Sequence, residues 1–222
     1  MGLGPEERAM QIVRILRYAT KGMVEPASTS IIKEYGKDPF LILVSCLLSL
    51  RTKDSVSLSA SRRLFRLAKT PEEILQLSIK KIEQAIYPVG FYRRKAKNLH
   101  QMSLQMRDQF GGKVPDTEED LLSLPGVGPK TANLVLGEAF GVPAICVDTH
   151  VHTISNRLGL VNTKRPEETE RVLKQILPKN YWIVFNRLLV MWGQNICVPV
   201  SPFCSRCAIS DLCPRIGVTK HR

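Results

Sequence analysis

Residues 121–137 read LLSLPGVGPKTANLVLG, and no other stretch of the chain is as informative. Two apolar helical segments flank the turn PGVG at residues 125–128, and Pro129 stands where a first-turn proline belongs. We therefore predict two helices joined by a tight turn. Gly126 and Gly128 would let the backbone approach a ligand, and the free N–H groups that open the second helix suit a phosphate. A plain turn between two helices has the same pattern, so the turn alone leaves both interpretations open.

Helical periodicity continues on both sides of this turn. No segment combines sustained alternation of apolar and polar residues with hairpin chemistry, so we predict an all-α fold. Thr70 is expected to cap a helix that begins at Pro71, and Gly111 to end another. The further helices that we expect cover residues 40–50, 54–67, 71–77, 79–86 and 94–110, with an opening helix that buries Ile12, Val13, Leu16 and Ala19, a short helix opened by Thr117, and a later one over 149–158.

The charge of the 222-residue chain points to a nucleic-acid partner. Lys and Arg number 32 against 20 Asp and Glu, which gives a net charge of +12 and a pI near 9.6. Residues 60–100 hold ten Lys or Arg and three Asp or Glu, which favours a local binding face. General solubility is the alternative reading of the charge. The sequence has neither an apolar run of roughly 20 residues nor a secretory h-region, so we expect a cytoplasmic protein without a membrane segment.

Lys130 and Asp148 are the two candidate catalytic residues. Lys130 would lie in the first turn of a helix, where the positive end of the helix dipole and partial burial both lower the pKa of an amine and free it for attack. A lone lysine on a helix is usually a solvated charge. Asp148, in VDTHVH (residues 147–152), could cap the following helix or stabilise positive charge on a sugar, and the two roles are compatible. His150 and His152 are spaced i, i+2, which does not place them on one helical face as a metal pair.

Six cysteines divide into two groups. Cys46 and Cys146 lie in apolar segments and are expected in the core. The other four form C-x6-C-x2-C-x5-C, which indicates a four-thiolate metal site: Cys197, Cys204, Cys207 and Cys213. Zinc is the common occupant of a C-x2-C pair, but zinc ribbons usually carry two such pairs, and four thiolates also suit a [4Fe-4S] cluster.

The motifs LPGVGPKTAN, VDTH and the cysteine spacing, in this order, resemble the endonuclease III family of DNA glycosylases and AP lyases. The resemblance spans most of the chain and implies two α-helical domains. Residues 32–142 would form a six-helix barrel containing the helix–hairpin–helix 121–137, and residues 1–31 with 143–222 a discontinuous iron–sulfur domain. It also implies that Lys130 is the nucleophile, that Asp148 is the catalytic carboxylate, and that the four cysteines bind a [4Fe-4S] cluster with a structural role.

The same resemblance implies DNA contacts, with three departures from the family pattern. The implied contacts are Arg51, Val89, Phe91, Gly126, Gly128 and His150. Arg51 stands where the family often has glutamine to fill the gap left by a flipped base, and Phe91 stands at a wedge position that is often leucine; an aromatic wedge still unstacks a base step. The loop 198–203 between the first two tail cysteines has no basic residue, which argues against a phosphate-binding role for it. The nearest cations are Arg206, Lys220 and Arg222.

These features favour a bifunctional base-excision-repair glycosylase with AP-lyase activity on oxidised pyrimidines. The expected partner is double-stranded DNA with damaged or abasic sites, the expected state is a monomer, and the expected place is with the DNA, in the nucleoid if the source is prokaryotic. A mismatch glycosylase that removes thymine, uracil or adenine is the sibling alternative, although Lys130 favours lyase chemistry. A non-catalytic DNA-binding module with a structural metal is the alternative from another class.

Overall fold

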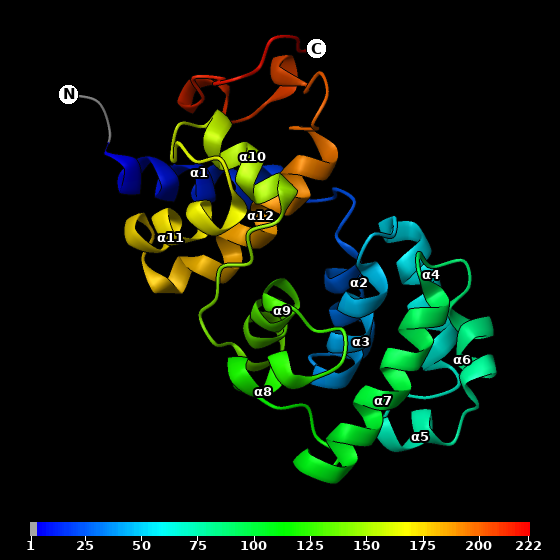
Figure 1. Cartoon of the computed structure of the whole chain (residues 1–222). Coiled ribbons are helices and arrows are strands. Elements are labelled where there is room, and N and C mark those ends of the chain that lie inside the picture. The colour runs from blue at the N-terminus through cyan, green and yellow to red at the C-terminus, as the bar shows by residue number, and fades with distance from the viewer. Residues whose placement is uncertain (1–3) are drawn as a thin grey trace. The chain divides into compact units, whose positions relative to one another are not determined.

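The computed structural model describes residues 4–222, which fold into two compact helical units (Figure 1). One unit is formed by residues 26–142, and the other joins the N-terminal segment through Glu25 to residues 143–222. Within the described residues the regular structure is helical and contains no strand, which confirms the all-α prediction. No helix of that part of the chain combines the length and apolar character that spanning a membrane requires.

The unit 26–142 is built around α3, the helix formed by the apolar run of the sequence. All residues from Phe40 to Leu48 in α3 are buried, because α2, α4, α7 and α9 pack around this helix. The helices of this unit are α2 (Ala27–Tyr35), α3 (Pro39–Ser49), α4 (Asp54–Phe65), α5 (Pro71–Leu75), α6 (Ile79–Ile86), α7 (Tyr92–Phe110), α8 (Glu118–Ser123) and α9 (Pro129–Phe140).

Side-chain caps fix where several of these helices begin. The hydroxyl of Thr70 accepts from the N–H of Glu73 at 3.2 Å, as expected for a cap before Pro71. Thr117 caps α8 in the same way, with a 3.2 Å bond from the N–H of Asp120. Gly111 ends α7 in the left-handed conformation at φ 59°, which a residue without Cβ adopts at little cost. The helix ends in this unit are therefore largely set by local sequence.

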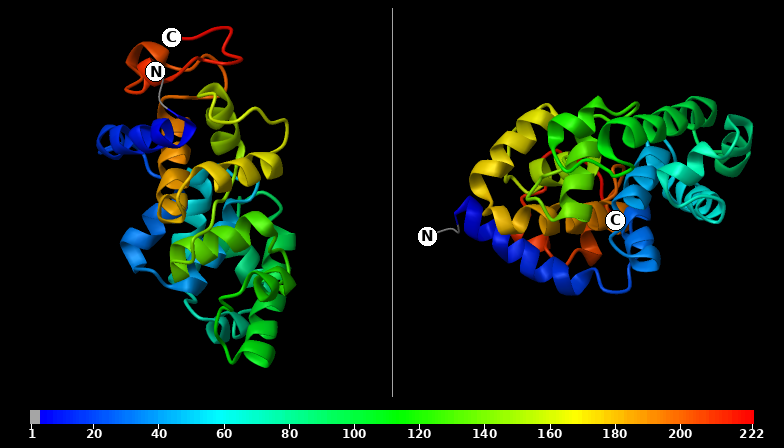
Figure 2. Two further views of the ribbon diagram at one scale, coloured as in Figure 1. Left: turned by 90° about the vertical axis from the view of Figure 1, so that its left-hand side faces the viewer. Right: turned by 90° about the horizontal axis from the view of Figure 1, so that it is seen from below.

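The second unit packs α1 and three later helices around its own core. α1 buries Ala9, Ile12, Val13 and Leu16 and packs against α12, as the views in Figure 2 show. After α12 the chain continues as turns rather than as long helices. The elements are α1 (Pro5–Ala19), α10 (Thr149–Arg157), α11 (Pro166–Ile176), η1 (Lys179–Tyr181), α12 (Trp182–Asn195), η2 (Cys204–Arg206) and η3 (Ser210–Leu212).

The boundary between the units differs from the predicted one. We placed residues 26–31 with the N-terminal segment, whereas the structure divides between Glu25 and Pro26. The reason is α2, which packs against α3 and α4 and buries Ile31 in the core of the unit 26–142. Helices α2, α11 and α12 were not delimited from the sequence.

Candidate active site and DNA-binding elements

The turn between α8 and α9 has the tight form that the sequence predicts. Gly126 has φ 86°, a left-handed conformation that favours glycine, and a Cβ built there would lie 2.5 Å from the amide nitrogen of Asn98. The N–H of Val127 donates to the carbonyl of Leu124 at 3.1 Å and closes the turn. Gly128 is the N-cap of α9, and a Cβ at this residue would meet nothing within 4 Å, so the start of α9 is open to a ligand.

Lys130 is the second residue of α9 and lies in the first turn, as predicted. Its side chain is exposed in this structure, so the partial burial that we expected is not present. Lys130 lies at the positive end of the dipole of the twelve-residue α9. Lys130 therefore stands beside an open helix N-terminus on the surface of the unit 26–142.

Asp148 caps α10 in the second unit. Its Oδ1 accepts a hydrogen bond from the N–H of Val151 at 2.9 Å, which fixes the carboxylate at the helix N-terminus. The predicted capping role is thus confirmed, and the carboxylate is half-buried rather than enclosed. Such a fixed negative charge is suited to stabilising positive charge that develops on a nearby reactant.

The two histidines of α10 do different things. His150 packs against α12 at Gly193, where any Cβ would lie 2.7 Å from its Cγ, so only glycine admits the ring there. His152 contributes Nδ1 to a 2.7 Å hydrogen bond with the hydroxyl of Thr169. The ring of His150 is half-buried against α12, and its predicted DNA contact stays a prediction.

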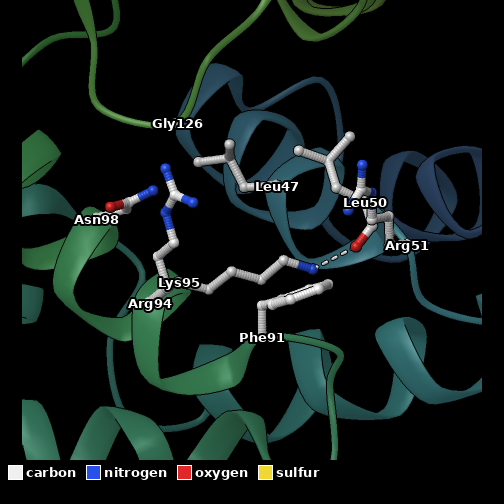
Figure 3. Close-up of a pocket in the computed structure, with 8 residues that line it drawn as sticks. All are labelled: Leu47, Leu50, Arg51, Phe91, Arg94, Lys95, Asn98 and Gly126. Carbon is white, nitrogen blue, oxygen red and sulfur yellow. Dashed lines mark hydrogen bonds between the residues drawn. The ribbon is translucent and has the colours of Figure 1, made fainter.

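Arg51 and Phe91 both line a pocket of about 390 Å³ (Figure 3). Both have left-handed backbones although neither is glycine, with φ 52° and φ 58°. The Arg51 guanidinium carbon lies 5.8 Å from the centre of the Phe91 ring, and Phe91 is 63% exposed. The pocket is lined by Leu47, Leu50, Arg51, Phe91, Arg94, Lys95, Asn98 and Gly126.

Val89 does not share this exposure. It is 1% exposed and belongs to the core of the unit 26–142. The side chain of Val89 therefore anchors the loop that carries Phe91 instead of facing solvent, and its predicted DNA contact stays a prediction. Val89 is buried and Phe91 is exposed on either side of Gly90, so one short loop is anchored in the core and also presents an aromatic ring to solvent.

Lys95 is a functional candidate that was missed in the sequence. Its side chain is buried, and its Nζ donates to the carbonyl oxygens of Leu48 at 3.0 Å and Leu50 at 2.6 Å. Burial lowers its pKa from 10.5 to about 8. The signal was available in the sequence, since Lys95 shares a helical face with the buried Leu99 and Met102 at i, i+4 and i+7.

The basic stretch 60–100 is correspondingly less available than its composition indicated. Lys95 is inside the unit, and Arg63 donates to the carbonyl oxygens of Ala85, at 2.9 Å, and of Tyr87. Arg62 is paired with Glu34. Some of the basic side chains in this stretch therefore bind groups of the protein itself, and fewer of them are available to contact a partner.

The four tail cysteines line one small cavity, as the predicted metal site requires. The cavity, of about 20 Å³, is also bordered by Arg157 and Phe203. Arg157 donates to the Cys197 sulfur at 3.3 Å and to the carbonyls of Val198 at 2.9 Å and Pro199 at 2.7 Å. One arginine of α10 thereby holds the start of the cysteine loop.

The sulfurs of this cavity are in a partly desolvated setting. Burial raises the pKa of Cys197, while the Arg157 guanidinium acts in the opposite direction. Burial also raises the pKa of Cys207 and Cys213. Across residues 4–222 no three Cys, His, Asp or Glu side chains are grouped closely enough to hold a single metal ion. The four thiols thus share a cavity without the compact arrangement of a mononuclear site.

The loop 198–203 gains cations that its own sequence lacks. The guanidinium carbons of Arg206 and Arg222 lie 4.3 Å and 3.9 Å from the centre of the Phe203 ring. Arg222 is also tied to the loop, since its Nε donates to the carbonyl of Ser201 at 3.0 Å. The neutral stretch therefore carries two exposed positive charges stacked on one aromatic ring.

Comparison with known proteins agrees with these features. Residues 44–179 match the profile of the HhH-GPD superfamily of base excision DNA repair proteins. The endonuclease III of Thermotoga maritima is 43% identical over 196 residues, which are 86% of this chain and 92% of that protein. A solved endonuclease III–DNA covalent intermediate, trapped with an estranged adenine, is 32% identical with a TM-score of 0.77 and covers 93% of this chain and 96% of its own. A thermostable thymine-DNA glycosylase structure is 25% identical with a TM-score of 0.81, over 94% and 96% of the two chains.

The class that fold and site define is therefore a helix–hairpin–helix enzyme of base excision DNA repair, a DNA-binding glycosylase and lyase. Within that class the chain belongs to the endonuclease III family. The resemblance drawn from LPGVGPKTAN, VDTH and the cysteine spacing is confirmed.

Proposed function

We propose that this enzyme removes oxidised pyrimidines from duplex DNA and cleaves the resulting abasic strand, with Lys130 as nucleophile. The observation that carries the proposal is the place of Lys130, in the first turn of α9 directly after the open glycine turn. That helix N-terminus attracts a DNA phosphate, which would bring a sugar of the same strand within reach of an amine located there.

The reaction follows from a lysine amine and a fixed carboxylate. The neutral amine of Lys130 attacks the anomeric carbon of the sugar, the bond to the base breaks, and the base leaves with a proton. The Asp148 carboxylate stabilises the positive charge that develops on the sugar. Ring opening gives a protonated Schiff base, loss of a proton from C2′ follows, and the C3′–O bond breaks with departure of the phosphate. Water then hydrolyses the imine and regenerates Lys130.

Arg51 and Phe91 support the proposal because they are suited to the distortion of DNA that base extrusion requires. A base must leave the stack before its sugar can be attacked, and this extrusion costs a few kcal/mol. Two exposed side chains held as neighbours, one cationic and one aromatic, are suited to occupy the vacated gap and to stack on the bases around it. We propose the backbone around Gly126 and Gly128 as a phosphate contact of the same complex.

We propose that the four tail thiolates hold a [4Fe-4S] cluster. Two features of the residues fit it: four sulfurs share a cavity, and the Arg157 guanidinium donates to the Cys197 sulfur. The indole N–H of Trp192 also lies close enough to Cys207 to lower the pKa of that thiol, against the larger effect of burial. The cluster would act as a structural cross-link for the tail.

The deciding experiment is borohydride trapping on a duplex that contains thymine glycol. The parent protein should form a covalent adduct, Lys130→Gln should form none, and the exposed Lys113→Gln should behave as the parent. An adduct that persists in Lys130→Gln would refute the assignment of the nucleophile. Absence of any adduct with the parent would refute the lyase proposal.

Iron and sulfide analysis of anaerobically purified protein tests the proposed cluster. One zinc per chain without iron would contradict it.

A second candidate is mismatch repair by removal of thymine, favoured by the similarity to a thymine-DNA glycosylase at a TM-score of 0.81. Duplexes with a G·T mismatch and with thymine glycol, compared at equal enzyme concentration, separate the two functions.

We also propose that the protein acts as a monomer. Its expected place is with the DNA, in the cytoplasm and, in a prokaryote, in the nucleoid. Light scattering of the free and DNA-bound protein tests the oligomeric state.

A further inference from the structure

Two short segments of the unit 26–142 meet face to face, residues 50–52 after α3 and residues 89–91 before α7. Each segment presents one of the two left-handed residues, Arg51 and Phe91. A left-handed backbone is unfavourable for a residue with a side chain, so it persists only where the surroundings hold it. Two sets of contacts hold both residues at once.

The first contact is between the two backbones. A Cβ on Gly90 would lie 2.6 Å from the carbonyl oxygen of Arg51, so only glycine allows this approach. The N–H of Gly90 donates to the hydroxyl of Thr52 at 3.1 Å, which ties the residue before Phe91 to the residue after Arg51. These contacts therefore hold the two segments against each other.

The second contact is the ammonium group of Lys95. Its Nζ binds Leu48 and Leu50 at the end of α3 and lies 3.4 Å from the Thr52 hydroxyl that holds Gly90. Figure 3 shows the side chain reaching from α7 to the end of α3, with its bond to Leu50 drawn as a dashed line. Lys95 is 8% exposed, and all three partners are neutral oxygens.

Such a buried cation is not explained by packing. An apolar side chain of similar length would fill the same space without the cost of desolvating a charge. What the ammonium group adds is three directed bonds that converge on the segment carrying Arg51, from the first turn of the helix that Phe91 opens.

We propose that Lys95 is a positioning residue, which with Thr52 and Gly90 holds Arg51 and Phe91 in their left-handed conformations before DNA binds. The proposal rests on the DNA-inserting role given to these two residues above. Pre-organisation of the pair means that the ordering of both loops is not required while the base is being extruded. Lys95 itself touches no reacting atom in this scheme.

The test compares Lys95→Met with the parent under single-turnover conditions on two substrates. On a thymine glycol duplex we expect the excision rate constant to fall by roughly tenfold or more. On a single-stranded oligonucleotide with the same lesion, where no base has to be extruded from a duplex, we expect the parent rate. The exposed Lys113→Met is the matched control and should equal the parent on both.

Fluorescence of 2-aminopurine placed opposite the lesion distinguishes the positioning role from a purely structural one. If Lys95 only stabilised the fold, the fluorescence of the bound duplex would be the same for Lys95→Met and the parent. Its rise on binding reports the opening of the stack, and Lys95→Met should reduce it at saturating enzyme. Equal loss of rate on duplex and single strand, or unchanged duplex rate and fluorescence, would overturn the proposal. Activity of the parent on the duplex establishes the underlying function, so its absence there would refute the function and not the positioning role.

Gly90→Ala keeps the proposal testable if Lys95→Met does not fold. It leaves the lysine in place and pushes the two segments apart at the Arg51 carbonyl. It should reproduce the duplex-specific loss. Gly4→Ala, where nothing lies within 4 Å of the added methyl, is its control. A Gly90→Ala protein with parent duplex activity would contradict the proposed coupling.

Discussion

The two units of this enzyme fill their interiors in different ways. The unit 26–142 closes a core made of helix faces, with α3 enclosed on several sides by its neighbours. The other unit has a helical core of its own, but its last part, after α12, runs as turns and contributes Ile209 and cysteines to the interior. The unit 26–142 thus buries whole helix faces, whereas the tail of the other unit buries single side chains, its cysteines among them. A cluster held by those cysteines, as proposed above, would cross-link the tail.

The largest effect that tests this difference between the two units is expected from substituting one cysteine in each of them. Cys207→Ala should abolish iron binding and cost more than about 3 kcal/mol of unfolding free energy, because the cross-link of the tail is lost. Cys46→Ala, in the core of the unit 26–142, should keep full iron content and cost about 1 kcal/mol. Iron content, absorbance near the charge-transfer region and denaturant titrations measure the difference. Equal effects of the two substitutions would remove the distinction drawn between the interiors.

Each unit also uses an arginine to hold backbone carbonyl groups, which allows a matched pair of substitutions. Arg157 bonds to Cys197, Val198 and Pro199, and Arg63 bonds to two carbonyls near the end of α6. Arg157→Gln should cost about 2–3 kcal/mol and speed the loss of iron to a chelator, since it releases the start of the cysteine loop. Arg63→Gln should cost about 1 kcal/mol and leave iron retention unchanged. If Arg63→Gln released iron as fast as Arg157→Gln, the effect would not come from the cysteine loop.

The sequence predicts the two regions unequally, and the reason is physical. Helix boundaries such as Thr70 before α5, Thr117 before α8 and Gly111 after α7 depend on neighbouring residues, so they are readable locally. The burial of Val89 and the carbonyl partners of Lys95 depend on elements that are distant along the chain, so the sequence does not give them, although it does place Lys95 on a buried helical face. The boundary at residue 26 was missed for the same reason, because α2 is assigned by what it packs against.

The site shows the same division. The cap formed by Asp148 and the place of Lys130 in a first turn follow from local sequence, whereas the exposure of Lys130 does not. The pairing of Arg206 and Arg222 on Phe203 brings together residues that are separated by the cysteines. The sequence of the loop 198–203 therefore understates the positive charge around it, because both arginines come from outside the loop.

Lys95 gives a pH-dependent test of the core of the unit 26–142. Its pKa in the folded protein is about 8 and lies near 10.4 in an unfolded chain, so the unfolded state binds more protons between these values. Stability of the parent relative to Lys95→Met should therefore rise as the pH increases from about 7 to about 10, by about 1–3 kcal/mol. Lys113→Met should show no such trend. Chemical denaturation at both pH values measures it, and a difference that falls with rising pH would contradict the burial of a charged amine.

The smallest expected effect concerns the cations on the cysteine loop. If Arg206 binds a DNA phosphate, Arg206→Gln should lower the slope of log affinity against log salt by about 1 and weaken binding several-fold at low salt, without changing iron content. Arg171→Gln on α11, an exposed arginine of the same unit, is the control and should leave the slope unchanged. Binding titrations with an undamaged duplex at several salt concentrations measure the slope. A slope that Arg206→Gln leaves at the parent value would mean that the charges stacked on Phe203 serve the shape of the loop and not its contact with DNA.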